Sequence, residues 1–241
     1  MVNIKAFVFN PFRENSYFVW DEEGSCVAID PSFYDEAEAA SVRELMKQEG
    51  LTLKAIWLTH AHFDHIYGVT ALQNEYSVPV LMSSDDEEIK VRDAGFAEGV
   101  SLKAPDVSFK VTPLHDGDIL DDLKGSPFKA IATPGHTMGG FCFYDEADRV
   151  LFSGDTLFCG TIGRTDLFGG DYDKLIVSIM DGLMGLPGDV DVLPGHGPRT
   201  TISDERTHNQ LLQPFNEPEE EEIDWDSDDL IELHPDGLPQ N

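Results

Sequence analysis

The sequence has few cysteines, few basic residues and no long apolar run. Its three cysteines, Cys26, Cys142 and Cys159, are widely spaced and include no CxxC pair. Neither a disulfide framework nor a thiolate zinc site is therefore predicted. The apolar runs are far shorter than a membrane span, and the start, MVNIKAFVFN, lacks the basic-then-apolar layout of a secretion signal. These absences predict a cytoplasmic protein with reduced thiols and no membrane partner.

Basic residues are scarce: 16 Lys and Arg stand against 46 Asp and Glu, and the formal net charge is −30. A surface of that sign repels phosphate, so nucleic acid is not an expected partner. A source living at high salt, or simply an acidic surface, would each account for the charge. The oligomeric state cannot be read from this composition.

The end of the chain differs from the rest in composition. Residues 217–241 carry eleven acidic residues and no Lys or Arg, a pattern typical of disordered segments. In the competing interpretation, Trp225 and the apolar residues 230–233 dock on the folded body. We therefore expect one folded domain over 1–216 and an acidic tail over 217–241 that is disordered or loosely docked.

Apolar patterning predicts alternating strands and helices within the first 216 residues. A second series of strands and helices follows the first, which indicates an α/β protein with two sheets sandwiched between helical layers. Strands are expected over 3–10, 15–22, 25–30, 53–58, 78–84, 107–111, 128–133, 140–145, 149–154 and 190–194, and helices over 34–50, 64–76, 85–96, 172–186 and 204–212.

Residues 59–65, T-H-A-H-F-D-H, follow the apolar run LKAIWL directly. His60 and His62 are two residues apart, so an extended backbone points both side chains to one side. Asp64 and His65 follow where the chain turns into a helix and can face the same point. This density of imidazole and carboxylate at a strand end favours a metal site over incidental surface residues.

Three other stretches share this layout of an apolar strand followed by a polar residue next to glycine. They are IATPGHTMGG with His136, VLFSGDTLF with Asp155, and DVLPGHGPRT with His196. Glycine beside each candidate lets the backbone turn sharply and approach closely. Together the four stretches offer five histidines and two aspartates, enough for two divalent metals with one carboxylate shared. Zinc is the first expectation, and iron or manganese accept the same ligands.

The combined pattern resembles the metallo-β-lactamase superfamily of hydrolases over about residues 3–215. Within it, GTIGRTDLFGGD (160–171) and LPGHGPRTTISDER (193–206) are similar to the small bacterial glyoxalase II-like enzymes. The resemblance implies the four-layer αβ/βα sandwich fold. It also implies that one metal is bound by His60, His62 and His136, that the other is bound by Asp64, His65 and His196, and that Asp155 bridges them.

The resemblance implies hydrolysis of a small thioester of the S-lactoylglutathione type by a metal-activated hydroxide, with Asp64 also orienting that hydroxide or taking a proton. No G-x-S-x-G elbow is present, so covalent serine catalysis has no support. Only 45 residues follow His196, so we do not expect the C-terminal helical domain that holds glutathione in larger glyoxalases II. Arg164 is the local cation that could bind a substrate carboxylate, or it could instead tie its own segment down.

Three alternatives remain open at this point. A persulfide dioxygenase shares the fold and a G-R-T-D segment but uses one iron held by two histidines and one aspartate, and LPGHGP departs from its last histidine motif. A lactonase or another ester hydrolase is the second alternative. A non-enzymatic metal-binding protein is the third, and the complete ligand set argues against it.

Overall fold

The computed structural model describes residues 1–99 and 102–215. The predicted acidic tail, 217–241, lies outside the described residues. In the part of the chain that is described, no helix combines the length and the apolar composition needed to cross a membrane.

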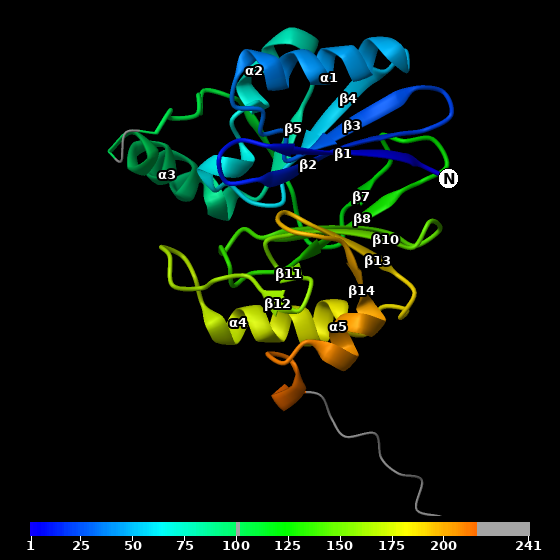
Figure 1. Cartoon of the computed structure of the whole chain (residues 1–241), viewed down its shortest axis with the longest axis vertical. Helices are drawn as coiled ribbons and strands as arrows, with labels where there is room; N and C mark the ends of the chain where they lie inside the picture. The colour runs from blue at the N-terminus through cyan, green and yellow to red at the C-terminus, as the bar shows by residue number, and fades with distance from the viewer. Residues whose placement is uncertain (100–101, 216–241) are drawn as a thin grey trace, which may run out of the picture.

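The molecule is built of four layers, two sheets packed face to face with helices on their outer sides (Figure 1). Each sheet has six strands, in the orders β1-β2-β3-β4-β5-β6 and β14-β13-β10-β9-β8-β7. This arrangement confirms the predicted α/β sandwich.

The first sheet and its helices come from the first half of the chain. Its strands are β1 (Asn3–Phe9), β2 (Glu14–Trp20), β3 (Ser25–Ile29), β4 (Thr52–Trp57), β5 (Val80–Met82) and β6 (Val111–Pro113), with helices α1 (Glu36–Gln48), α2 (Val69–Tyr76) and α3 (Glu87–Gly99) and the 3₁₀ turns η1 (Phe63–His65) and η2 (Ser84–Asp86).

The second half repeats this organisation. Its strands are β7 (Ile119–Leu120), β8 (Phe128–Ala132), β9 (Phe141–Asp145), β10 (Val150–Gly154), β13 (Asp191–Pro194) and β14 (Thr200–Thr201), with a small hairpin of β11 (Leu157–Phe158) and β12 (Thr161–Ile162). Its helices are α4 (Tyr172–Val177), the π-helix η3 (Ser178–Leu183), α5 (Ile202–His208) and the 3₁₀ turn η4 (Gln213–Phe215).

The period-two alternation of side chains explains the layering. In β3, Cys26 and Ala28 pack in the core beneath the first helices, whereas Val27 and Ile29 pack in the core between the two sheets. A third core lies between the second sheet and α4, η3 and α5. Three apolar layers thus fix how the two sheets stack, and hence where their strand ends meet.

Several predicted elements differ in extent from the observed ones. The helix expected over 64–76 is a 3₁₀ turn followed by α2, which begins only at Val69. At Gly68 the chain runs so close to Phe33 that a Cβ there would lie 2.4 Å from the ring. The interruption lets the backbone present the polar residues of 60–65 before the helix begins.

In the second half, the predicted helix over 172–186 is α4 continued by a π-helix. The last helix begins at Ile202, where the Thr201 side chain caps the Asp204 amide. The strand expected over 107–111 forms at Val111–Pro113 instead. The two-residue strand β7 was not predicted, because its length carries no periodicity.

Candidate metal centre

All seven predicted ligands come together where strands of the two sheets end. The segment 59–65 follows β4, and the other three ligands follow β8, β10 and β13. His60 and His196, which are 136 residues apart in the sequence, thus belong to one cluster, because the His65 ring lies next to both. The glycine-flanked strand ends therefore lie together at one place in the fold.

The first ligand group consists of His60, His62 and His136, whose inward ring nitrogens lie within 4.8 Å of one another. His136 Nε2 and His62 Nδ1 are 2.9 Å apart. The Nδ1–H of His136 donates to the carbonyl oxygen of Arg164 at 2.7 Å, which leaves Nε2 as the free nitrogen.

The second ligand group consists of Asp64, His65 and His196, again within 4.8 Å. His196 Nε2 lies 3.3 Å from Asp64 Oδ2. The Nδ1–H of His65 donates to Asp30 Oδ2 at 3.0 Å, so its Nε2 faces the cluster. Asp64 and His196 keep side-chain exposures of 14% and 27%, which makes this group the one more open to solvent.

Asp155 lies between the two groups. Its Oδ2 is 3.5 Å from His136 Nε2 and 3.7 Å from His196 Nε2, and its Oδ1 is 3.4 Å from His65 Nε2. A Cβ at Gly195 would lie 2.4 Å from Asp155 Oδ1 and 2.7 Å from the His65 ring. Glycine at 195 therefore leaves the room in which this carboxylate reaches both groups.

The chemistry of the donors fits divalent metal ions. His60 Nε2, His65 Nε2 and Asp155 Oδ1 are buried and make no hydrogen bond. Buried polar atoms without partners are costly, so three such atoms aimed at one cluster mark a place for a cation. Imidazole and carboxylate donors are those preferred by zinc, iron and manganese.

The two groups differ in their electrostatics. Burial lowers the pKa of His62 to about 3, helped by His136, and burial together with neighbouring imidazoles lowers the pKa of His60. Burial alone would raise the pKa of Asp155, but the surrounding histidines, His65 foremost, outweigh burial and hold it well below its usual range. For His65, burial is outweighed by carboxylates and its pKa rises well above normal.

One buried carboxylate that was not predicted orients both groups. Asp30 accepts from the Thr59 hydroxyl at 2.6 Å and from His65 at 3.0 Å. Because the Thr59 hydroxyl gives its proton to Asp30, it accepts from His60 Nδ1 at 3.0 Å. Asp30 thereby fixes the tautomers of His60 and His65, with Nε2 of each turned inward. Asp30 directly follows β3. This position at a strand end is the sequence feature that could have identified it.

A second unpredicted carboxylate, Asp86, ties the ligand segments together. It is fully buried and accepts from the Ala61 amide at 3.0 Å, the Gly139 amide at 2.8 Å and the Thr137 hydroxyl at 2.9 Å. It therefore holds the 60–65 segment against the loop that carries His136. No sequence signal identifies it, because its partners are distant in the chain.

The predicted substrate residue Arg164 lies on the surface beside this cluster. Its Nε and one terminal nitrogen donate to the two oxygens of Asp166 at 2.7 and 2.8 Å, and its side chain is 60% exposed. The Asp166 carboxylate therefore occupies the fork that a substrate carboxylate would need. The role in substrate binding stays a prediction.

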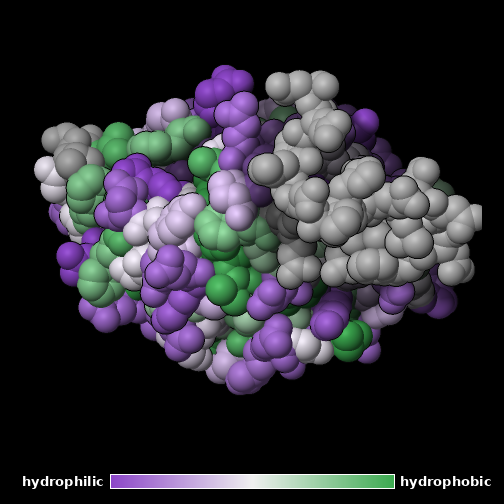
Figure 2. All heavy atoms as spheres, turned by 90° about the horizontal axis from the view of Figure 1, so that it is seen from below, coloured by the Kyte–Doolittle hydropathy of each residue, from purple (hydrophilic) through white to green (hydrophobic). Residues whose placement is uncertain are grey.

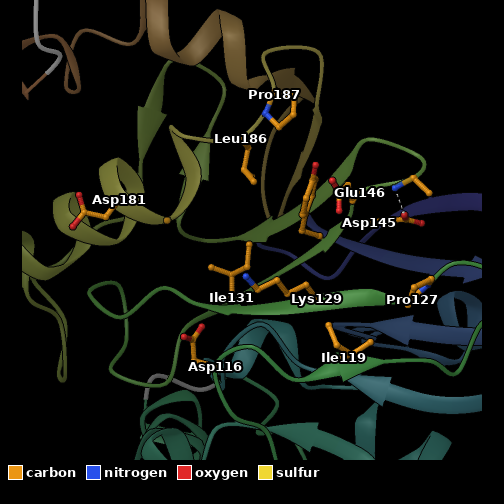
Figure 3. A pocket seen from close by; sticks show the side chains of 13 residues that line it. Asp116, Ile119, Pro127, Lys129, Ile131, Asp145, Glu146, Asp181, Leu186 and Pro187 are labelled. Carbon is orange, nitrogen blue, oxygen red and sulfur yellow. Dashed lines mark hydrogen bonds between the residues drawn. The ribbon is translucent and has the colours of Figure 1, made fainter.

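A separate groove of 820 Å³ lies away from the ligands, on the outer side of the second sheet (Figure 3). Its lining comes from β7, β8 and β9, their flanking loops, and the segment around η3, and includes Ile119, Lys129, Ile131 and Leu186. None of the seven predicted ligands lines it, so it is not part of the candidate metal centre.

Comparison with known proteins agrees with this geometry. The chain is 34% identical over 212 residues to the probable metallo-hydrolase YqgX of Bacillus subtilis, covering 86% of this chain and 95% of that protein. It is 33% identical over 217 residues to the hydroxyacylglutathione hydrolase GloC of Haemophilus influenzae, covering 88% and 98%.

Among solved structures, the chain is similar to the B3 metallo-beta-lactamase BLEG-1, with a TM-score of 0.78 and 35% identity over 87% of this chain and 99% of that one. It is also similar to TTHA1623 in a di-iron-bound form, with a TM-score of 0.77 and 38% identity over 86% and 100%. The profile of the metallo-beta-lactamase superfamily matches residues 9–198. The chain therefore belongs to the metallo-beta-lactamase superfamily.

Proposed function

We propose that this protein is a dinuclear metal-dependent thioester hydrolase of the glyoxalase II type. The observation that carries the proposal is the pair of three-residue ligand groups on either side of one carboxylate, Asp155. The first and second ligand groups would each hold one divalent ion, with Asp155 shared. Such ions would act as Lewis acids and would lower the pKa of a bound water to near neutral pH.

The chain's own residues would orient the reactants. Asp64 has a carboxylate that is partly exposed at the cluster, and burial, which raises its pKa, is outweighed by His196, so the group stays ionised. It is therefore placed to accept a hydrogen bond or a proton from an attacking water. Asp30 holds the rings of His60 and His65 in one tautomer while that proton moves.

A thioester suits a site with no dedicated acid. The thiolate that leaves has a parent pKa of about 8.5 and needs no proton from the protein. The name of the Haemophilus influenzae relative describes a hydroxyacylglutathione hydrolase, and a similar substrate is proposed here. One observation disfavours a mononuclear persulfide dioxygenase: the second ligand group provides a complete additional set of donors.

The test is a substrate panel run with metal analysis on the same preparation. The panel contains S-lactoylglutathione, a thioester of a neutral thiol, a lactone and a β-lactam, and glutathione persulfide is assayed by oxygen consumption. We expect about two metals per chain and hydrolysis of the thioesters in preference to the lactone and the β-lactam. One iron per chain with oxygen consumption, or a clear preference for the lactone or the β-lactam, would contradict the proposal.

A further inference from the structure

Three phenylalanine side chains from separate segments meet beside the ligand cluster. Phe12 lies in the turn between β1 and β2, Phe63 stands between two predicted ligands, and Phe96 lies on α3. The ring centroids of Phe12 and Phe63 are 5.0 Å apart, and those of Phe63 and Phe96 are 6.4 Å apart. We call these three residues the aromatic wall.

The aromatic wall is fixed to the ligand segment at both ends. The side-chain amide of Asn10 donates to the Asp64 carbonyl at 2.8 Å, and its oxygen accepts from the Phe12 amide at 2.9 Å. On α3, Asp93 lies one turn before Phe96, and its Oδ2 is 3.8 Å from His62 Nε2. The position of the wall relative to the ligands is therefore determined by the same contacts that shape the cluster.

A second apolar segment faces solvent near the same end of the molecule. Leu167 and Phe168 are 42% and 45% exposed, and they lie between Arg164, whose carbonyl holds His136, and α4. The Arg92 guanidinium of α3 covers the Phe168 ring at 4.1 Å. Figure 2 shows hydrophobic side chains on the surface at the end where Figure 1 places α3 and the loop before α4.

Exposed aromatic residues at this place need an explanation. Phe12 and Phe96 are 39% and 58% exposed, although an exposed apolar cluster is unfavourable in water and commonly marks a binding surface. Near the wall the Asp93 carboxylate lies 3.8 Å from His62 Nε2, the Arg92 guanidinium of α3 covers the Phe168 ring, and Arg164 is engaged by Asp166. The three rings themselves are uncharged and apolar, so the surface that they form suits an apolar group.

We propose that the aromatic wall binds an aromatic or branched aliphatic group attached to the scissile thioester, either on its acyl side or on its thiol side. This inference rests on the proposed thioester hydrolysis and adds a preference to it: thioesters with an apolar group next to the reacting carbonyl are preferred over those without one, such as S-lactoylglutathione. The partly exposed rings of Phe12 and Phe96 can pack face-on or edge-on against such a group. This packing would exclude water from the adjacent metal centre.

The test compares three thioesters in the metal-loaded full-length protein. Acetyl-N-acetylcysteamine carries no large apolar group, phenylacetyl-N-acetylcysteamine carries one on the acyl side, and the acetyl thioester of benzyl mercaptan carries one on the thiol side. We expect the wild type to prefer one of the two phenyl-bearing substrates by about tenfold in kcat/KM, the scale of burying an aromatic-sized group. Which of the two is preferred identifies the side that the wall contacts.

The variants are Phe96→Ala, Phe12→Ala and Phe96→Leu, with Phe215→Ala as the matched control. Phe215 is similarly exposed, at 42%, but lies in η4 after α5. We expect each alanine variant on the wall to lower the preference for the phenyl-bearing substrate to near unity, Phe96→Leu to restore part of it, and Phe215→Ala to leave it unchanged. A preference unaffected by either alanine substitution would overturn the inference, although thioester hydrolysis would stand.

Binding of non-hydrolysable thioethers gives a readout that does not depend on turnover. Calorimetry would compare the phenethyl and ethyl thioethers of N-acetylcysteamine on the wild type and on Phe96→Ala. Tighter binding of the phenethyl compound, lost in the variant, supports the wall even if no thioester is hydrolysed, in which case only the proposed function fails. Equal binding of both compounds to the wild type contradicts the wall.

Discussion

The two ligand groups lie side by side but differ in charge. In the first group the pKa values of His60 and His62 are lowered, chiefly because burial disfavours the imidazolium form and other imidazoles are close. In the second group burial acts in the same direction, but nearby carboxylates outweigh it and raise the pKa values of His65 and His196. His60 and His62 of the first group are thus held neutral, whereas His65 and His196 of the second group hold protons more readily.

This difference shows that ligand identity alone does not decide how a metal is taken up. A metal binding at the first group meets His60 and His62 with lowered pKa values and so need displace no proton from these two rings near neutral pH. A metal binding at the second group must displace protons from His65 and His196. Asp155, whose oxygens lie 3.4 to 3.7 Å from histidines of both groups, is the residue that we propose couples them.

The largest effect is expected for Asp155→Asn, which removes the shared charge. Both groups should lose metal, and turnover should fall by at least about a thousandfold, because several kcal/mol of transition-state stabilisation correspond to about three decades in rate. Metal content by mass spectrometry and thioester turnover measure the effect. Asp181→Asn, an exposed carboxylate on η3, is the control and should change neither. Retention of two metals with near-normal rates would show that Asp155 is not shared.

The next effect is the pH dependence of metal uptake. The pKa values of His65 and His196 are raised. Both side chains are therefore protonated when the pH is at or below the ordinary imidazole pKa, and they lose their protons as the pH rises above it. Each proton displaced weakens binding about tenfold per pH unit below its pKa. Zinc titration of the apo protein at two pH values, one below and one well above the ordinary imidazole pKa of about 6.5, should therefore bind fewer ions at the lower pH and approach two at the higher. Equal stoichiometry at both pH values would remove the distinction between the groups.

A smaller effect is expected for Asp30→Asn. An amide in place of this carboxylate turns a donor toward His65 Nδ1, which favours the tautomer with the proton on Nε2, the nitrogen that faces the cluster. We expect the second group to lose about 10- to 100-fold in metal affinity, the usual cost of removing an outer partner. The first group should lose less, because His60 reaches Asp30 only through Thr59. Competition titrations with a chelator separate the two affinities.

Site residues could be predicted from the sequence where a single short segment contains all the features that identify them. The convergence of the seven candidate ligands could be expected because each follows an apolar strand and is flanked by glycine or by other candidates, and strand ends of a layered α/β fold meet. Asp30 has the same position after a strand but neither of those neighbours. Asp86 could not be found, because its carboxylate acts through contacts with Ala61, Thr137 and Gly139 that only the stacked sheets create.

The smallest effect is expected for Arg164→Ala. The backbone carbonyl of this residue accepts a hydrogen bond from His136. Alanine keeps that carbonyl, so metal content should be unchanged. Its side chain forms an exposed pair with Asp166, and such pairs contribute about 0–1 kcal/mol. KM for S-lactoylglutathione should therefore rise by less than about tenfold, while KM for a neutral thioester stays constant.

Asp166→Asn is the informative partner of that variant. If Arg164 binds a substrate carboxylate once Asp166 no longer competes for its fork, Asp166→Asn should lower KM for the anionic thioester and leave the neutral one unchanged. Steady-state kinetics of both variants with both substrates give the answer. An equal change for anionic and neutral substrates, accompanied by a lower Tm, would mean that Arg164 and Asp166 serve only to hold residues 164–171 in place. The first ligand group would then depend on this segment for the position of His136, whereas the second would not.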